Sequence, residues 1–426
     1  MTYDPLAPAS KLRTHEIFAG LRRECPVHHH PMPPEELARQ AANDRVAGLT
    51  REFWSVVRYD DCVRVLQSPE TFSNLQGPGP ERRVRTGTEG MLLVADDPAH
   101  RRQRQIANKG FLPRVVQART SLIQNTADDL IDGVATRGRA DVMSDLSIPL
   151  TVAMITDFFG AGGDRRDNIA RWGSAIVNAN GGDQAAVEAS TEAITGLITF
   201  IVGIVNERRA ESAAGREPAN DVLTALINAE HEGRRFTDEE ICTAAMQFLS
   251  AGFETTATAI GSAVQLLCTY PEQRAKLEAD WSLLDNACEE ILRFESPIEG
   301  TFRTTNDAVT VADEALPVDA KVRVVYASAN RDETRFPDAD VFRVDRPATE
   351  LRKHIAFGHG SHACIGSALA RAELRIALRT VLTRLPGLDL DPDRAPRRST
   401  SFTVNGYTSV PIVWDVARVR PRETHN

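Results

Sequence analysis

The sequence predicts a mainly α-helical fold with small β-sheets in the later part of the chain. Helical patterns dominate from Pro113 onward, a long and almost uncharged segment follows Thr237, and short extended segments follow residue 300. No period of roughly 20 to 50 residues repeats, and no low-complexity linker divides the chain. We therefore expect a single domain that spans residues 1–426.

The segment that follows Thr237 is expected to be a buried helix. Thr237 and Glu240 have the spacing of a capping box, in which each side chain bonds the backbone amide of the other residue. Between Ile241 and Cys268 the only charged side chain is Glu254. A helix that is apolar on nearly every face lies in a protein interior. The glutamines and hydroxyl groups within it argue against a membrane span.

Shorter elements are expected after this helix. A second helix is predicted over about residues 282–294. Residues 308–311 and 321–327 are predicted to be extended, the second because its side chains partly alternate in polarity. A last helix is predicted after Cys364, and it ends at Leu385 because proline and glycine follow.

The composition is that of an ordinary globular protein and excludes some functions. The chain has 426 residues, of which 42% are apolar and 26% are charged, and its net charge is −9. This charge argues against a nucleic-acid binder held by a broad basic surface. The six cysteines form no CxxC pair and the N-terminal segment has no apolar stretch. We therefore expect reduced thiols, no membrane anchor and a cytoplasmic location.

The segment from Phe357 to Gly366 is the most informative in the sequence. It contains three glycines besides its cysteine, which indicate backbone that turns tightly or approaches another group closely. Cys364 is expected at the start of the last helix, where amide groups and the helix dipole favour a thiolate. A thiolate is the ligand that donates electron density to haem iron and favours O–O cleavage. These residues predict a haem iron bound by Cys364.

Other interpretations of this segment stay open. There are three alternatives for Cys364. It is a small buried hydrophobic residue, a zinc ligand together with His359 and His362, or a nucleophile that acts with a histidine. The zinc site lacks an obvious fourth ligand and leaves the glycines unexplained. A run of histidines at residues 28–30 is another metal candidate, although a solvated run is the favoured interpretation.

The predicted buried helix carries an acidic group at its centre. Burying a carboxylate is costly, so Glu254 is expected to be paired, hydrogen-bonded or protonated. Gly252 costs about 1 kcal/mol relative to alanine inside a helix, which indicates that another group packs closely against it. A buried acid beside Thr255 is a candidate functional site, and an internal salt bridge is the alternative.

The segment around Cys364 closely resembles the haem-binding signature of the cytochrome P-450 superfamily, Phe-x-x-Gly-x-His/Arg-x-Cys-x-Gly. Every fixed position matches, namely Phe357, Gly360, His362, Cys364 and Gly366. The resemblance covers essentially the whole chain. It implies a single-domain cytochrome P-450 fold with haem b (iron protoporphyrin IX) between the long central helix and the Cys-loop helix. The residues that it places at the haem are His100, Arg104, Ala251, Gly252, Arg303, Phe357, Gly358, His362, Cys364 and Gly366.

Residues 251–256 are similar to another motif of this family, Ala/Gly-Gly-x-Asp/Glu-Thr-Thr/Ser. The similarity implies that Glu254 and Thr255 supply protons during oxygen activation, and that Gly252 lets the helix pass over the haem. Glu254 and Thr255 are therefore our candidate catalytic residues.

Residues 97–104 are similar to the family's Asp-Pro-x-x-His-x-x-x-Arg segment. His100 and Arg104 are one helical turn apart, so they can reach one ligand together. By the resemblance they bind haem propionates, together with Arg303 and His362. Charge-assisted bonds from arginine to a carboxylate are the strong kind.

Glu290 and Arg293 resemble the family's Glu-x-x-Arg motif and share a helix face. Taken alone, such a pair would be a surface contact worth a few tenths of a kcal/mol. The resemblance implies a buried charged pair that is tied to Arg346 and has a structural role.

The resemblance implies a monooxygenase that inserts one atom of O2 into a lipophilic small molecule, by hydroxylation or oxidative dealkylation. Electrons would come from an iron–sulfur ferredoxin and its NAD(P)H-dependent reductase, and the chain would act as a monomer. The ferredoxin would dock on a basic patch of Arg101, Arg102, Arg104, Lys109, Arg352, Lys353 and Arg371. The largely apolar substrate pocket would include Phe248, Ile298, Gly300, Thr301 and Phe402.

Some functional alternatives stay open. Arg82, Arg83 and Arg85 are candidates for pairing a substrate carboxylate, although a solvated loop is favoured. A peroxide-driven haem-thiolate oxygenase is the second enzyme candidate, and the pair Glu254 and Thr255 argues against it because that pair serves O2. A haem-binding sensor without turnover is the rival from another class, and it would not need this pair.

Overall fold

The structure is a computed structural model of the chain. It describes residues 3, 10, 13–31, 52–80, 92–160, 168, 171–172, 184–216, 221–228, 230–231, 233–399, 401 and 403–422. Two compact units are present, each built from several chain segments. The sheet unit comprises Met1–Arg104, Leu292–Val341 and Thr349–Cys364, and the helical unit comprises Gln105–Ile291, Phe342–Ala348 and Ile365–Asn426. The single-domain expectation stays a prediction.

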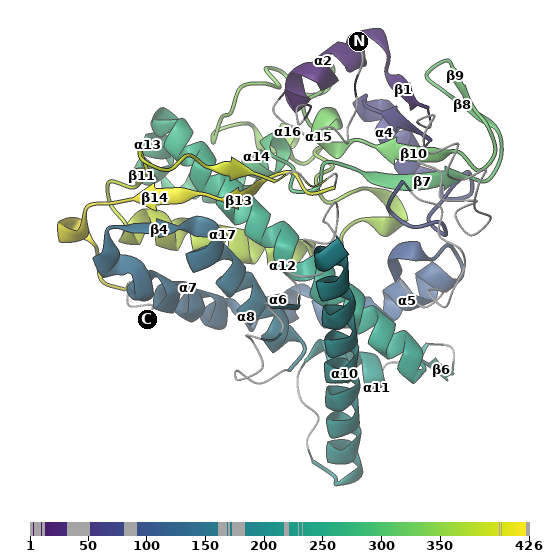
Figure 1. Ribbon diagram of the computed structural model, residues 1–426, viewed down its shortest axis with the longest axis horizontal. Helices are drawn as coiled ribbons and strands as arrows, with labels where there is room; N and C mark the ends of the chain where they lie inside the picture. Colours follow the sequence, from purple (N-terminus) through teal and green to yellow (C-terminus); the bar gives the residue numbers. More distant parts are fainter. Residues whose placement is uncertain are drawn as a thin grey trace. The chain divides into compact units, whose positions relative to one another are not determined.

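The sheet unit is organised around one mixed sheet (Figure 1). Its strands lie in the order β1 (Val27–His30), β2 (Phe53–Val56), β10 (Lys321–Val324), β7 (Thr301–Thr305) and β3 (Phe72–Ser73). Strands β2 and β10 are parallel, and the other neighbours are antiparallel. The remaining elements are α2 (Thr14–Glu24), α4 (Tyr59–Gln67), η1 (Leu92–Val94), β8 (Val309–Val311), β9 (Glu314–Leu316), α15 (Tyr326–Ala329) and η7 (Gly360–His362).

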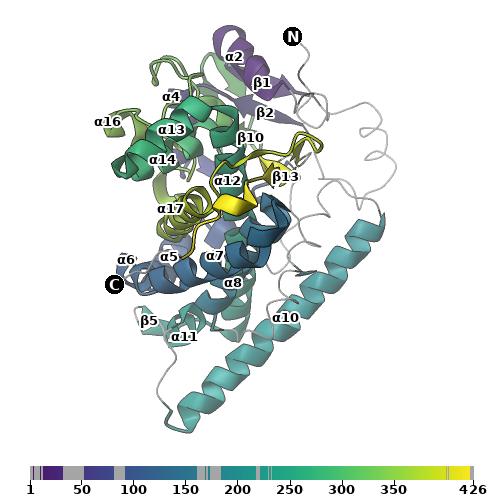
Figure 2. The same ribbon diagram turned by 90° about the vertical axis from the view of Figure 1, so that its left-hand side faces the viewer.

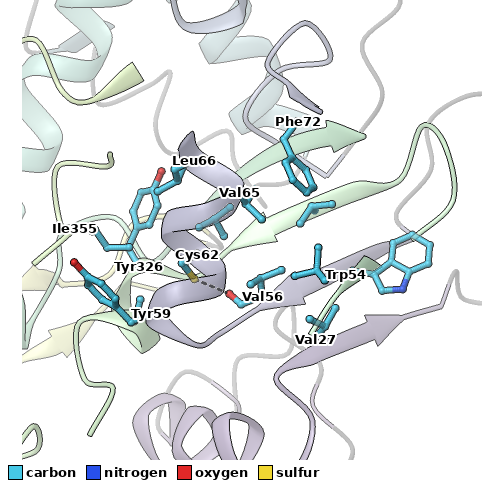
Figure 3. Packing of buried hydrophobic residues seen from close by; sticks show 14 of the residues in the cluster. Val27, Trp54, Val56, Tyr59, Cys62, Val65, Leu66, Phe72, Tyr326 and Ile355 are labelled. Atoms are coloured by element: carbon cyan, nitrogen blue, oxygen red, sulfur yellow. Dashed lines mark hydrogen bonds between the residues drawn. The ribbon is translucent and has the colours of Figure 1, made fainter. Parts of the chain in front are cut away.

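Apolar side chains from the sheet and from α4 form the core of this unit (Figure 3). Val56, Val65, Phe72 and Val322 are all fully or almost fully buried. Burial of each such side chain contributes about 1.5–3 kcal/mol. The Cys62 thiol within this core donates to the carbonyl oxygen of Val56 at 3.2 Å. The core thus fixes α4 on the sheet.

The helical unit contains most of the helices (Figures 1 and 2). They are α6 (Pro113–Gln117), α7 (Thr120–Val134), α8 (Ile148–Phe158), α10 (Gln184–Ala213), α11 (Val222–Asn228), α12 (Asp238–Thr269), α13 (Pro271–Ala279) and α17 (Ser367–Arg384), with the short helices η2 (Lys109–Phe111), η3 (Ala135–Arg137), η4 (Val142–Ser147), η6 (Trp281–Leu283) and η8 (Val416–Arg418). Three elements cross from one unit's segments into the other's, namely α5 (Ala99–Asn108), α14 (Leu284–Phe294) and α16 (Ala348–Leu351).

Helix α12 is the centre of the helical unit. It packs against α8, η4 and α17, while α7 packs against α8 and α17. Three small sheets accompany these helices: β11 (Asp389–Leu390) with β14 (Pro411–Val413) and β4 (Arg139–Asp141), β12 (Arg397–Arg398) with β13 (Tyr407–Ser409), and β5 (Glu230–His231) with β6 (Arg234–Arg235). The predicted mainly α fold with small sheets is confirmed.

The start of α12 agrees with the sequence pattern. The Thr237 hydroxyl accepts from the Glu240 amide at 3.2 Å, and the Glu240 carboxylate accepts from the Thr237 amide at 2.9 Å. This capping box satisfies two amides that would otherwise lack a helical partner. The predicted buried helix over 237–268 is therefore confirmed. Among the residues that the structure describes, no helix has the length and apolarity needed to cross a membrane.

Two local predictions were wrong. The strand predicted over 321–327 ends at Val324, and Tyr326 begins the short helix α15 because the Asn330 amide bonds the Tyr326 carbonyl. The histidine run is not uniformly solvated, because it forms strand β1. His30 is buried and bonded to Ser55, and burial lowers its pKa to about 2, whereas His29 is exposed and pairs with Glu52.

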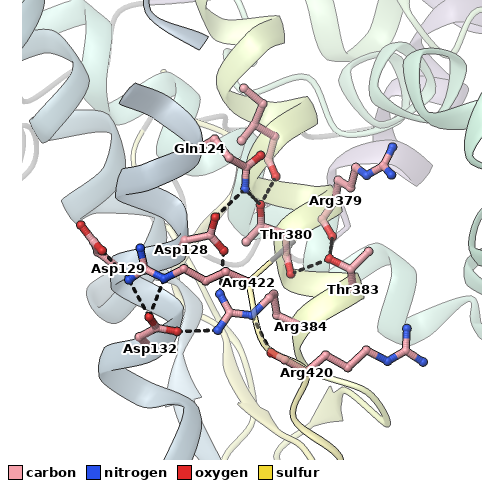
Figure 4. Close-up of polar contacts among 11 residues, drawn as sticks. Gln124, Asp128, Asp129, Asp132, Arg379, Thr380, Thr383, Arg384, Arg420 and Arg422 are labelled. Atoms are coloured by element: carbon pink, nitrogen blue, oxygen red, sulfur yellow. Dashed lines mark hydrogen bonds and ion pairs between the residues drawn. The ribbon is translucent and has the colours of Figure 1, made fainter. Parts of the chain in front are cut away.

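An ion-pair network ties the end of the described chain to α7 and α17 (Figure 4). The buried Arg384 side chain pairs with Asp128 at 2.6 Å and also with Asp132. Arg422 pairs with Asp129 and Asp132 at 2.6 Å each. The network belongs to the helical unit and holds its C-terminal segment in place.

Candidate functional site

The cysteine loop is the segment from Phe357 to Gly366, which includes η7, and its residues up to Cys364 lie in the sheet unit. Gly358 and Gly360 have φ values of 71° and 73°, the left-handed region in which a side chain is strained. These turns let the Cys364 amide donate to the Phe357 carbonyl at 2.8 Å. The Cys364 side chain is exposed. Gly366, the N-cap of α17, has an ordinary φ of −84°.

Three contacts inside the sheet unit hold this loop in place. A Cβ atom added at Gly360 would lie 2.5 Å from the Leu66 carbonyl oxygen of α4, so only glycine fits there. The Gln67 amide and the His359 ring are bonded at 2.8 Å. The Ile355 amide donates to the Asn330 side chain at 2.7 Å. The loop is therefore preorganised to present the Cys364 sulfur.

Four basic residues predicted to bind propionates gather near Cys364 within the sheet unit. The rings of His100 and His362 are stacked with centroids 3.8 Å apart. Burial, and then the neighbouring His100, Arg303 and Arg104, lower the pKa of His362 to about 3. Burial also lowers the pKa of Arg104, and the nearby Cys364 sulfur acts in the opposite direction. His100, Arg104, Arg303 and His362 thus lie near one another, and their predicted role as propionate ligands stays a prediction.

This cluster combines two arginine cations with two histidines whose pKa values burial lowers. The buried Nε2 atom of His100 has no hydrogen-bond partner among the described residues, although the other ring nitrogen lies 3.6 Å from Asp97. Among the described residues, neither Arg104 nor Arg303 forms an ion pair with a carboxylate. Burial lowers the pKa of both guanidinium groups. Buried cations require an anionic partner. The donor set therefore fits the propionate carboxylates of a haem, with the Cys364 sulfur nearby as the candidate iron ligand.

The surroundings of Arg303 were not foreseen from the sequence. Its Nη1 atom donates to the Phe302 carbonyl at 2.8 Å and to the Thr301 hydroxyl at 3.4 Å. The Thr301 hydroxyl is bonded to the Tyr326 hydroxyl at 2.6 Å. The only available signal was that a buried tyrosine needs a partner for its hydroxyl. The sequence assigned Thr301 to the substrate pocket instead, and that role stays a prediction.

The acid and alcohol of α12 lie in the helical unit. The Thr255 hydroxyl donates to the Ala251 carbonyl at 3.0 Å, one turn earlier. Burial raises the pKa of Glu254 to about 7. Of the three expected states of the Glu254 carboxyl, paired, hydrogen-bonded or protonated, this raised pKa favours the protonated one, and it lets the group hold or release a proton near neutral pH. The predicted close packing at Gly252 is also confirmed, because an added Cβ atom would lie 2.7 Å from the Ile155 side chain.

The predicted pocket residues lie in both units. In the helical unit the buried Phe248 ring contacts Phe111 at 5.2 Å between centroids. In the sheet unit Ile298 packs on the core, and Gly300 approaches the Val324 carbonyl so closely that an added Cβ atom would clash with its oxygen. Phe402 and the arginines at 82, 83 and 85 lie outside the described residues.

Glu290 and Arg346 form a buried pair in the helical unit. The Arg346 Nε atom donates to the Glu290 carboxylate at 2.9 Å, and both side chains are fully buried. The Arg343 amide donates to the other carboxylate oxygen at 3.1 Å. Arg293, in the sheet unit, is also fully buried and donates to the carbonyls of Asn330 and Ala339. The alternative of a surface pair is excluded.

The basic patch predicted for ferredoxin docking is distributed over both units. In the sheet unit Arg101, Arg352 and Lys353 are exposed, Arg102 and Arg104 are half-buried, and Arg101 pairs with Asp97 at 2.8 Å. In the helical unit Lys109 is exposed and Arg371 is held by Glu289 at 2.6 Å.

An open groove of about 970 Å³ runs along α10 in the helical unit. Trp172, Gly196 and Phe200 are among the residues that line it, and Gly196 packs closely against the Trp172 ring. No described residue of the cysteine loop or of the centre of α12 contributes to this groove. The groove is therefore separate from the part of α12 that carries Glu254.

The zinc alternative has no support in the described part of the chain. No three histidine, cysteine, aspartate or glutamate side chains there are arranged to hold a metal ion. The six cysteines, all within the described residues, form no disulfide.

Comparison with known proteins gives one consistent result. The family model described as Cytochrome P450 matches residues 185–408. The chain is 34% identical over 373 residues to cytochrome P450 107B1 of Saccharopolyspora erythraea, with 84% of this chain and 88% of that protein covered. It is also 34% identical over 361 residues to the steroid C26-monooxygenase of Mycolicibacterium smegmatis, with 84% and 86% covered.

A solved structure agrees with these sequence matches. The fold is similar to that of cytochrome P450 CYP109Q5 from Chondromyces apiculatus, with a TM-score of 0.82, 31% identity, and coverage of 97% of this chain and 98% of that one. Sequence and fold similarity both extend over most of the chain. The chain therefore belongs to the cytochrome P450 family of haem-thiolate monooxygenases.

Proposed function

We propose that the chain binds haem b with Cys364 as the axial iron ligand and oxidises a lipophilic small molecule. The observation that carries this proposal is the cluster of bases beside an exposed cysteine, in which neither arginine is paired with a described carboxylate. In this proposal Arg104, Arg303 and the two histidines bind the propionates. Bound haem supplies the redox chemistry that activates O2.

The proton relay would be formed by Glu254 and Thr255. The pKa of about 7 for Glu254 suits a group that takes up a proton and passes it on at neutral pH. The Thr255 hydroxyl, which donates to Ala251, would rotate to donate toward the haem side. Ala251 and Gly252 would then line the helix surface that faces the haem.

The electron donor in this proposal is an iron–sulfur ferredoxin with its NAD(P)H-dependent reductase. Exposed cations such as Arg352 and Lys353 support docking of an acidic partner, because complementary charge accelerates encounter. We also propose that the protein is monomeric and cytoplasmic, the latter because its cysteines form no disulfide.

The proposed substrate is an apolar molecule of steroid or similar size. The predicted pocket residues Phe248, Ile298 and Gly300 offer only apolar or small surfaces. One relative at 34% identity is a steroid C26-monooxygenase. A library of terpenoids, steroids, fatty acids and substituted aromatics would be screened by the shift of the Soret band on binding.

The first experiment is the absorption spectrum of purified, haem-supplemented protein. We expect a Soret band and, after reduction under carbon monoxide, the red-shifted band that reports a thiolate ligand. Colourless protein would contradict the proposal. Turnover with peroxide alone, and none with ferredoxin and reductase, would favour the peroxide-driven alternative.

The relay is tested by Thr255→Ala. We expect the variant to consume reducing equivalents but to divert most of them into peroxide or water, so that product per electron falls. Thr269→Ala, which removes a hydroxyl at the other end of α12, is the matched control. Unchanged product per electron in Thr255→Ala would refute the assignment.

A further inference from the structure

We infer that Tyr326 is a positioning residue of the haem site, which holds Arg303 through Thr301. This inference rests on the proposed function, because it concerns the propionate-binding role of Arg303. It assigns a task to a residue that lies outside every motif recognised in the sequence. All the residues involved belong to the sheet unit.

The contacts form a continuous chain from the phenol to the guanidinium. The Tyr326 and Thr301 hydroxyls are bonded at 2.6 Å, and Arg303 Nη1 donates to the Thr301 hydroxyl at 3.4 Å. The Phe302 carbonyl accepts a second bond from the same Nη1 atom at 2.8 Å. One side of the guanidinium is thus held by fixed acceptors, which leaves its other nitrogen atoms to face a ligand.

Burial makes these contacts difficult to replace. Tyr326 is 5% exposed and Arg303 7% exposed, so water cannot readily replace a lost partner. An arginine guanidinium in such surroundings requires nearby acceptors to offset the loss of its hydration. The Tyr326 hydroxyl, together with Asp96, supports the charged form of Arg303 against burial.

The same hydroxyl lies near the turn at Gly358. A Cβ atom added at Gly358 would be 3.6 Å from the Tyr326 oxygen, in ordinary van der Waals contact. In Figure 3 the Tyr326 ring stands beside Leu66 and Ile355, in the core on which the loop rests. Tyr326 therefore contacts the strand that carries Arg303, and its hydroxyl lies near the turn that leads to Cys364.

The test compares two tyrosine-to-phenylalanine variants of the holoprotein. Tyr326→Phe removes the hydroxyl described above. Tyr59→Phe is the matched control, because Tyr59 lies in the same core and its hydroxyl donates to the Lys353 carbonyl at 2.6 Å, away from Arg303. The readouts are the rate of haem transfer to excess apomyoglobin and the propionate bending modes in the resonance Raman spectrum.

We expect haem transfer to be about tenfold faster in Tyr326→Phe, as for the loss of one buried hydrogen bond to a charged group, with shifted propionate modes. Tyr59→Phe should stay within about twofold of wild type, with unshifted modes. Equal transfer rates and unshifted modes in the two variants would overturn the inference. Thr301→Ala, which keeps the tyrosine ring, should reproduce the effect and guards against a folding defect in Tyr326→Phe.

A double-variant cycle separates positioning from simple packing. If Tyr326 acts through Arg303, then Tyr326→Phe combined with Arg303→Gln should lose haem no faster than Arg303→Gln alone. Additive effects would contradict the inference. Wild-type protein without haem or without the thiolate band would instead refute the proposed function, so the two failures are distinguishable.

Discussion

The two units withdraw opposite kinds of ionisable group from water, bases in one and an acid in the other. In the sheet unit, His100, Arg104, Arg303 and His362 gather, and burial lowers the pKa of each. In the helical unit Glu254 is the only charged residue of a long apolar segment, and burial raises its pKa to about 7. In the sheet unit the described residues form no ion pair with Arg104 or Arg303, and in the helical unit they form none with Glu254.

The difference shows what each arrangement is suited to do. A cluster of bases withdrawn from water is stabilised by an anion from outside the chain, so it indicates binding. A lone acid in an apolar helix can neutralise itself by taking up a proton, so it indicates proton transfer. Buried charges that satisfy each other, such as Glu290 and Arg346, indicate structure instead.

The largest expected effect tests the binding role proposed for the sheet unit. Cys364→Ser would remove the proposed sulfur ligand of the iron, so we expect the red-shifted band of the reduced carbon monoxide complex to disappear and product formation to cease. Cys25→Ser, at a partly exposed cysteine of the same unit, should leave the spectrum unchanged. Retention of the thiolate band in Cys364→Ser would show that the iron ligand has been misassigned.

The second effect tests whether the paired charges are structural. Arg346→Met removes the cation that pairs with the fully buried Glu290 at 2.9 Å, and we expect the free energy of unfolding to fall by about 3–5 kcal/mol. Lys276→Met breaks the exposed pair with Asp345 and should cost less than about 1 kcal/mol. Urea unfolding measures both. Similar losses in the two variants would contradict the assigned role of burial.

The third effect tests the proton-transfer role proposed for Glu254 in the helical unit. Folded Glu254 keeps its proton up to a pH of about 7, whereas the unfolded group loses it near the ordinary glutamate pKa of 4.5. The unfolded state therefore binds fewer protons in this window, and the stability of the wild type falls as pH rises through it. Glu254→Gln removes this loss, so relative to wild type it should gain about 2–3 kcal/mol between pH 4 and pH 8.

Unfolding curves at several pH values measure this gain. Glu239→Gln, at an exposed position in the first turn of the same helix, is the control and should keep the wild-type pH dependence. If Glu254→Gln also keeps that dependence, the carboxyl is not protonated in the folded protein at neutral pH.

The smallest effect concerns the network in Figure 4. Arg422 is 45% exposed, so Arg422→Ala should cost less than about 1 kcal/mol. Arg384→Met should cost more, because the buried Asp128 would lose its cation. Thermal unfolding of the two variants ranks them, and the reverse order would show that exposure does not govern this network.

Much of the site could be predicted because its signals are local. The start of α12 is visible in the capping box of Thr237 and Glu240, whose two bonds span three residues. The turns before Cys364 are visible because Gly358 and Gly360 occupy backbone conformations that other residues avoid. Glu254 is conspicuous because it interrupts an otherwise uncharged segment.

The contacts that were missed join residues far apart in the chain. Tyr326 reaches Thr301 across 25 positions, and Arg323 forms a fully buried pair with Glu299 across 24. The burial of His30 depends on its pairing with β2, which no pattern within the histidine run reveals. Such contacts depend on strand order and register, which pairing between distant segments establishes.

The sequence by itself determined the helical character of the chain, the acid in its buried helix, and the glycine turns that present Cys364. Local propensity, hydrophobic pattern and backbone sterics act within a few residues, so they can be recognised without a fold. Only the tertiary structure decided which polar groups face one another, such as Tyr326, Thr301 and Arg303. Side-chain hydrogen bonds require a separation of about 3 Å, and only the packed strands and helices bring distant residues that close.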